Sequence, residues 1–121
     1  MKRDLDLVRA ILKDVENAPA GKTIIQPTLE GYGDKDIGEH VWLLADAGLI
    51  DAEVTRTMRG PYTILIRRLT WRGHDFIDAA KNDSVWNQVK GKILKHVGGV
   101  TFDVLLELLK AETRLKLGLP S

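Results

Sequence analysis

The sequence contains no cysteine, which excludes disulfide bonds and thiolate chemistry. It also lacks an apolar run of the roughly 18 residues that a membrane-spanning helix needs. Its first residues, MKRDLDLVRAIL, mix both charges at helical spacing and do not resemble a signal peptide. We therefore expect a cytoplasmic protein without a membrane partner. The 121 residues, of which 44% are hydrophobic and 29% charged, suffice for a single domain with one core.

One sign of charge is missing from the middle of the chain. Residues 54–72 contain five arginines and no acid, a net charge of +5. Residues 19–53 contain seven acids and two lysines, a net charge of −5, and the whole chain is near neutral at +1. The basic block would either face an anionic partner or pair with the acids of the same chain. The sequence leaves both alternatives open.

No catalytic or metal-binding motif can be assembled from the residues. The best candidate is His74 with Asp78, which lie four residues apart on one helical face in the segment LTWRGHDFIDAA. No nucleophile stands near this pair, so we interpret His74 as a surface or half-buried histidine. His40, His74 and His96 fall on separate predicted helices without the spacing of a metal site. We predict a non-enzymatic protein without catalytic residues, metal or cofactor.

Hydrophobic spacing and turn residues predict an α+β chain. The expected helices are residues 3–17, 34–47, 70–80, 83–97 and 101–118, and the expected strands are residues 23–25, 50–58 and 62–69. Asp34, Thr70 and Thr101 are predicted to begin the second, third and fifth helices as caps, and Gly48 to end the second. We expect the side chains of Trp42 and Trp71 to turn toward the core.

The order helix, short strand, helix and hairpin is typical of a winged-helix domain. The second helix runs through AGLI into the hairpin, as a recognition helix joins its wing. One departure is visible, because QPTLEGYG leaves room only for a turn where such domains have a further helix. We predict a winged-helix-like core in residues 1–80. Residues 81–121 would form a helical extension that packs on this core or makes a dimer contact, within a single domain overall.

Three segments of the chain resemble a known family. They are MKRDLDLVRAIL, GY…EHVWLLADAGLIDA and RRLTWRGHDFIDAAKNDSVWNQVK. In this order they are similar to the family called domain of unknown function 2513, whose members are small bacterial and prophage proteins. The resemblance implies a winged-helix-like fold and a bacterial or phage setting. It implies no activity and no functional residues.

The basic hairpin is the first candidate site. Its arginines lie on or beside the predicted wing, where they would reach DNA phosphates or a minor groove. Strand alternation places Arg67 and Arg68 on opposite faces. We expect weak, salt-dependent binding of duplex DNA by a regulatory protein. The predicted DNA contacts are Arg56, Arg59, Arg67, Arg68, Lys35 and His40.

The start of the second helix is the other candidate site. The segment GDKDIGEHVW carries Asp34, Asp36 and Glu39 where a DNA-reading helix presents basic or amide side chains. These acids repel DNA but would suit a basic surface on a host protein. The alternative function is therefore a phage- or prophage-type interaction module that binds or inhibits a host protein. From the sequence we rank DNA binding ahead of it.

The last helix has more apolar residues than one buried stripe requires. We predict that Phe102, Leu105 and Leu109 form a homodimer contact. The open alternative is that they are buried within the same chain.

Overall fold

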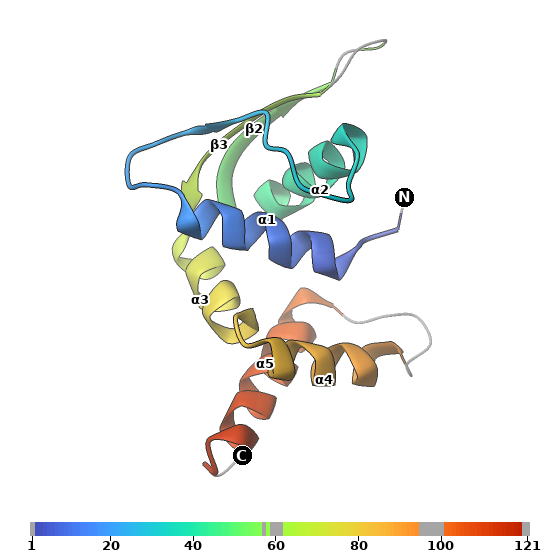
Figure 1. The fold of residues 1–121 in the computed structure, drawn as a ribbon, viewed down its shortest axis with the longest axis vertical. Coiled ribbons are helices and arrows are strands. Elements are labelled where there is room, and N and C mark those ends of the chain that lie inside the picture. Colours follow the sequence, from blue (N-terminus) through green and yellow to red (C-terminus); the bar gives the residue numbers. More distant parts are fainter. Residues whose placement is uncertain (1, 57, 59–61, 95–100, 120–121) are drawn as a thin grey trace. The chain divides into compact units, whose positions relative to one another are not determined.

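The computed structural model describes residues 2–56, 58, 62–94 and 101–119 (Figure 1). The predicted α+β class is confirmed, since these residues form helices and one small antiparallel sheet. The elements are α1 (Leu5–Asn17), β1 (Ile24–Ile25), α2 (Asp34–Asp46), β2 (Ile50–Thr55), β3 (Thr63–Leu69), α3 (Trp71–Ala80), α4 (Asp83–Leu94) and α5 (Phe102–Lys116). None of the described helices is both long enough and apolar enough to cross a membrane.

The chain forms two compact units, Met1–Asp75 and Phe76–Ser121. The boundary between them lies inside α3, before the one expected after residue 80. The first unit holds the sheet with α1 and α2, and the second holds α4 and α5. Both candidate sites predicted from the sequence belong to the first unit.

A capping aspartate sets the start of α1. The Asp4 carboxylate accepts a hydrogen bond from the Leu7 amide at 3.1 Å. This bond satisfies one of the amides that the first helical turn leaves without a partner. The helix therefore begins two residues later than the hydrophobic pattern predicts. Its buried residues recur at helical spacing and are Leu7, Val8, Ile11, Leu12 and Val15.

A tight turn carries α2 directly into β2. Gly48 has a φ of +78°, in the left-handed region that glycine adopts without strain. The Leu49 amide donates to the Leu44 carbonyl at 2.9 Å, which closes a Schellman motif and confirms the predicted stop. At the other end the predicted cap is wrong, because Gly33 and not Asp34 occupies the N-cap position. Asp34 lies in the first turn, where its charge favours the helix dipole.

The sheet has the order β1-β3-β2, and both strand pairs are antiparallel. α1 packs against β3, and α2 packs against β2 (Figure 1). On the inner face, Ile64 and Ile66 of β3 are 2% and 1% exposed. Since successive strand residues point to opposite faces, the charged residues of β2, Asp51 and Glu53, lie on the outer face.

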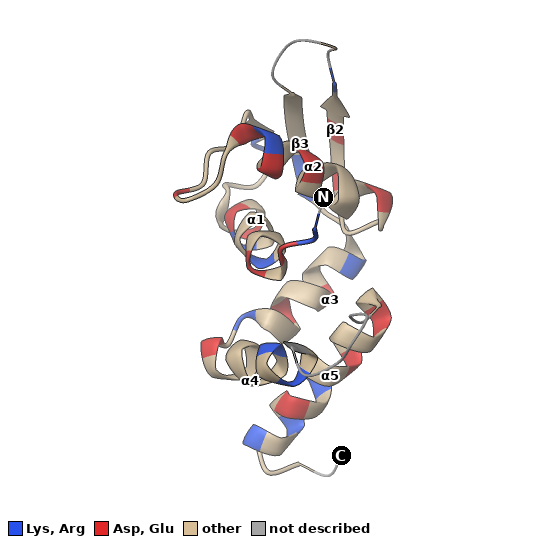
Figure 2. Ribbon diagram, turned by 90° about the vertical axis from the view of Figure 1, so that its right-hand side faces the viewer, with Lys and Arg blue, Asp and Glu red and all other residues tan. Residues whose placement is uncertain are grey.

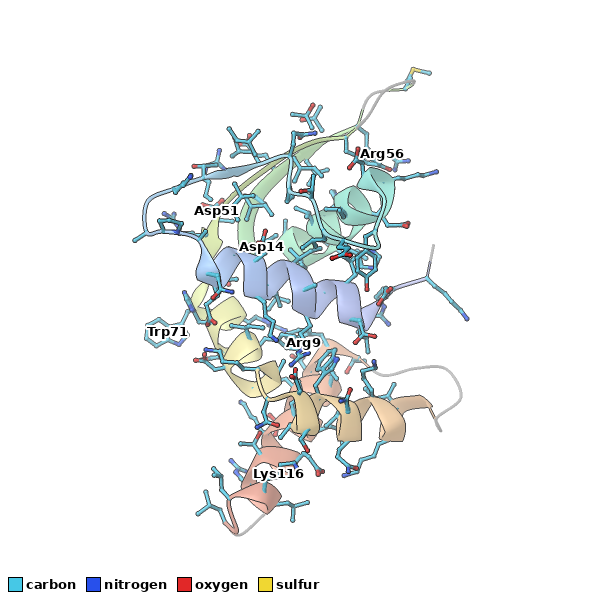
Figure 3. The ribbon with its side chains drawn as sticks, viewed as in Figure 1. Arg9, Asp14, Asp51, Arg56, Trp71 and Lys116 are labelled. Carbon is cyan, nitrogen blue, oxygen red and sulfur yellow. The ribbon has the colours of Figure 1, made fainter. Side chains whose placement is uncertain are left out.

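Two tryptophans that were predicted to turn inward lie at the surface. Trp42 is 50% exposed on α2, and Trp71 is 86% exposed at the start of α3. Figure 3 shows the Trp71 ring directed away from the ribbon. Both predictions were wrong for a geometrical reason. Trp71 lies about 140° around the helix from the buried Phe76, and Trp42 about 100° from the buried Val41, so neither shares its neighbour's face.

The second unit has an aromatic centre. The Phe76 ring centroid lies 4.8 Å from that of Phe102 and 6.5 Å from that of Trp86, the latter pair edge to face. Leu105 and Leu109 are buried, and Phe102 is half-buried. Of the three residues predicted as a dimer contact, the two leucines are thus covered by their own chain, and Phe102 is covered in part. The burial of Leu105 and Leu109 agrees with the alternative, burial within one molecule, and the homodimer itself stays a prediction.

Candidate functional site

The exposed side of α2 carries acids around a tryptophan. Lys35, Glu39, Trp42 and Asp46 follow the spacing i, i+4, i+7, i+11, which places them in one line along the helix. We call these four residues the outer stripe of α2. The first turn adds further acids beside it, and Figure 2 shows red acidic residues on this helix. The structure therefore brings the predicted acids together and adds Trp42 and Asp46, which the sequence analysis missed.

Glu39 is held in place by the hairpin. The Tyr62 hydroxyl donates a hydrogen bond to Glu39 Oε1. Arg56 Nη1 lies 3.7 Å from the same oxygen, and its guanidinium carbon lies 5.6 Å from the centre of the Tyr62 ring. The Tyr62 hydrogen bond, helped by the charge of Arg56, lowers the pKa of Glu39 below its ordinary value. The same bond raises the pKa of Tyr62. Glu39 is thus an oriented, ionised carboxylate.

Two further residues position Tyr62. A Cβ at Gly38 would lie 2.7 Å from Tyr62 Cγ, so only glycine lets the ring lie this close to α2. Gln26 adopts a positive φ of +50°, and its side-chain amide donates to the Tyr62 carbonyl at 2.9 Å. Its side-chain oxygen accepts a bond from the Ile64 amide. The Gln26 side chain thereby continues the pairing of β1 with β3 and holds the base of the hairpin.

The arginines of β3 are paired with acids of β2. Arg67 lies 3.5 Å from Asp51 Oδ1 and 2.9 Å from Glu53 Oε1. Arg68 lies 3.3 Å from Asp51 Oδ2. The hydrogen bond to Glu53 raises the pKa of the Arg67 guanidinium above its ordinary value. Arg67 and Arg68, like Arg56, therefore form ion pairs with acids of the same chain, which is one of the two alternatives that the charge pattern left open.

A β-bulge brings Arg67 and Arg68 to the same side of the sheet. Asp51 pairs with Arg68 and Ala52 with Ile66, so Arg67 is an extra residue in β3. Both guanidinium groups therefore reach Asp51, one at each carboxylate oxygen. The prediction that the two arginines point to opposite faces was wrong, because one extra residue breaks the period of two on which it depended.

His40 serves the fold and does not face solvent. It is 2% exposed, and its Nε2 accepts a hydrogen bond from the Asp4 amide at 2.8 Å. Its Nδ1 therefore carries the proton and donates to the Asp36 carbonyl, also at 2.8 Å. This corrects the prediction of His40 as a DNA contact, since the ring is occupied between α1 and α2. Of the other predicted contacts, Lys35 is exposed and Arg59 lies outside the described residues.

The histidine singled out in LTWRGHDFIDAA has no catalytic partner in the described parts of the chain. His74 is exposed, and Asp78 Oδ1 lies 3.4 Å from Lys81 Nζ. Among the described residues, no three His, Asp or Glu side chains converge as metal ligands would. His96 lies outside these residues, so the interpretation of the three histidines stays a prediction.

A hollow of about 350 Å³ lies beside Trp42, between α2 and β2. Its lining residues are Trp42, Ala45, Asp46, Ala52, Glu53, Val54 and Thr55. Its walls are mixed: Trp42, Ala45, Ala52 and Val54 are apolar, whereas Asp46, Glu53 and Thr55 are polar or acidic. Sequence reasoning missed this feature because it placed Trp42 in the core. The line of residues 35, 39, 42 and 46 is the signal that could have located it.

Comparison with known proteins gives two matches. The family described as "Hypothetical protein (DUF2513)" matches residues 2–100 of the chain. An "Uncharacterized protein" of Haemophilus influenzae is 31% identical over 109 residues, which cover 89% of this chain and 92% of the relative. No solved structure matches the chain.

Proposed function

The chain belongs to the family described as "Hypothetical protein (DUF2513)", and from this premise we propose that it is a non-enzymatic protein-interaction module. It would bind a basic surface of another protein through the outer stripe of α2. The observation that carries this proposal is an exposed tryptophan set among acids, in a unit where the hairpin arginines that the structure describes, Arg56, Arg67 and Arg68, form ion pairs with acids of the same chain. The proposed setting is the bacterial cytoplasm.

The charge of α2 is available to a partner. Within the described part of the chain, the side chains of Asp34, Asp36 and Asp46 have no ion-pair or hydrogen-bond partner. Exposed pairs contribute only about 0.2–1 kcal/mol each, so these acids alone do not supply tight binding. They would instead accelerate encounter with a basic surface and select against acidic ones.

Trp42 supplies the apolar contact that such binding needs. Tryptophan is among the residue types most enriched at the energetic centres of protein interfaces, where its truncation costs about 2 kcal/mol or more. Half of Trp42 is solvent-exposed, and the hollow beside it offers room for side chains of a partner. We therefore expect the partner to present an apolar residue surrounded by lysine or arginine.

A matched pair of double variants tests the proposal. Trp42 and Asp46 lie four residues apart on α2, and Trp71 and Asp75 lie four residues apart on α3; all four are exposed. Purified W42A/D46K and W71A/D75K are used with the wild type to recover partners from a bacterial lysate, quantified by mass spectrometry. We expect W42A/D46K to lose the recovered partner, W71A/D75K to retain it, and added salt to weaken the interaction. The proposal is refuted if W42A/D46K retains the partner, or if no recovered protein depends on Trp42 and Asp46.

DNA is the weaker candidate partner. The observation in its favour is that the side chains of Arg56 and Arg68 are 70% and 75% exposed despite their ion pairs. Fluorescence anisotropy with a random 30-mer duplex at two salt concentrations tests it. If pairing within the chain neutralises the hairpin, D51N/E53Q binds the duplex more tightly than the wild type does. Strong, steeply salt-dependent binding by the wild type would instead support the DNA hypothesis.

A further inference from the structure

The outer edge of β2 has no strand beside it. In the order β1-β3-β2, β3 is paired on both sides, and no strand in the described residues pairs with the outer side of β2. Such an edge presents unpaired backbone N–H and C=O groups, which can pair with another chain. The hollow beside Trp42 is lined by residues 52–55 of this same strand.

This edge lacks several devices that usually protect one. Protected edges carry proline or lysine, or a bulge that twists the strand away. β2 has the sequence IDAEVT, without either residue, and its register shift lies at its start, between Asp51 and Ala52. Residues 52–55 then pair in regular register with residues 66–63, without the extra residue of the bulge. Over residues 52–55 the strand is therefore free of the bulge that would interrupt pairing with another strand.

The two faces of β2 differ in chemistry. Ala52 and Val54 pair with the buried Ile66 and Ile64 and share their face, yet both are only half-buried, because they line the hollow. Glu53, between them, also borders the hollow, but its side chain lies on the opposite face of the sheet, where it pairs with Arg67 at 2.9 Å. A strand added to this edge would thus have one face toward the apolar side chains of Trp42, Ala52 and Val54 at the hollow and the other beside the carboxylates of Glu53 and Asp51.

We infer that β2 pairs with an extended segment of the partner in which apolar and basic residues alternate. The apolar side chains would enter the hollow beside Trp42, and the lysines or arginines would lie beside Glu53 and Asp51. Backbone hydrogen bonds would supply affinity, and the alternating pockets would supply specificity, as in other cases of strand addition. This inference rests on the proposed function, since it names the kind of segment that the outer stripe of α2 recruits.

The test uses an end-blocked, fluorescein-labelled peptide of four Val-Lys repeats and two N-methylated versions. One version is methylated on every valine nitrogen and the other on every lysine nitrogen. Successive N–H groups of a strand point to opposite edges, so pairing with β2 uses one of these two sets only. We expect one methylated peptide to bind at least about tenfold more weakly than the parent, and the other within about threefold of it. The affected set also reveals whether the added strand is parallel or antiparallel.

The same titrations separate this inference from the proposed function. Binding should weaken in W42A and stay unchanged in W71A, and the amide NMR signals of residues 52–55 should shift when the parent peptide is added. Equal binding by both methylated peptides, equal loss by both, or no binding of the parent overturns strand addition. The proposed function fails separately, if recovery of the protein partner does not depend on Trp42 and Asp46.

Discussion

Replacing Gly73 by alanine tests how closely the first turn of α3 approaches the turn between α2 and β2. A Cβ at residue 73 would lie 2.0 Å from the Leu49 carbonyl oxygen, whereas ordinary contacts begin at 3.4 Å. The first turn of α3 would have to retreat by about 1.4 Å, the difference between these two distances. That movement breaks the bond from the Thr70 amide to Leu49, at 3.0 Å, and the bond from the Thr70 hydroxyl to the Gly48 carbonyl, at 2.6 Å.

The expected loss of stability follows from these contacts. Each hydrogen bond contributes about 1 kcal/mol net, and overpacking in a tightly packed site costs about 1–3 kcal/mol. The higher helix propensity of alanine returns about 1 kcal/mol. We therefore expect the free energy of unfolding to fall by about 2–4 kcal/mol in Gly73→Ala. The α2–β2 turn that this contact supports also sets the position of the proposed binding surface.

Urea unfolding followed by circular dichroism at 222 nm measures this loss. With a slope of about 1–2 kcal/mol per molar urea, the midpoint should drop by about 1 M or more. Gly91→Ala is the matched control, because Gly91 also lies inside a helix but a Cβ there would meet nothing within 4 Å. We expect this control to gain about 0.5–1 kcal/mol. An unchanged or higher midpoint in Gly73→Ala, or an equal loss in both variants, refutes the close approach as the cause.

Four other substitutions have outcomes that the structure predicts. Tyr62→Phe should lower the melting temperature most at neutral pH. The lowered pKa of Glu39 stabilises the fold at pH values above the ordinary glutamate pKa of 4.5, and the raised pKa of Tyr62 stabilises it at pH values below the ordinary tyrosine pKa of 10.0. The difference from the wild type should therefore shrink toward pH 3 and pH 11, and a difference independent of pH contradicts the pairing. His40→Ala should cost about 2–4 kcal/mol in urea unfolding, because it leaves two backbone groups without partners; a loss below about 1 kcal/mol argues against this role. Trp42→Ala should change the free energy of unfolding by less than about 0.5 kcal/mol. Trp86→Ala should lower it by about 3–5 kcal/mol, because Trp86 is only 1% exposed. Similar losses in both variants would contradict the exposed position of Trp42.

Local chemistry made most of the secondary structure predictable from the sequence alone. Thr101 caps α5 by accepting a bond from the Val104 amide at 3.3 Å, and Thr70 accepts one from the Gly73 amide at 3.1 Å. Gly48 ends α2 as predicted. These signals involve residues within a few positions of one another, so a single segment contains all the information they need. The charge blocks were also visible, and one of the two interpretations offered for them was pairing within the chain.

The tertiary structure alone decided which of these residues are exposed to solvent. Successive residues of a helix are about 100° apart, and the sequence pattern locates an apolar stripe only to within about this angle. Trp42 could therefore be assigned to either side of α2. The burial of His40 depends on an amide 36 positions away, and the side of Arg67 depends on a bulge between two strands. Exposure is a property of what other segments cover, and those segments are distant in the sequence. The elements could therefore be predicted locally, whereas the proposed binding surface is defined by contacts that form only when the first unit has folded.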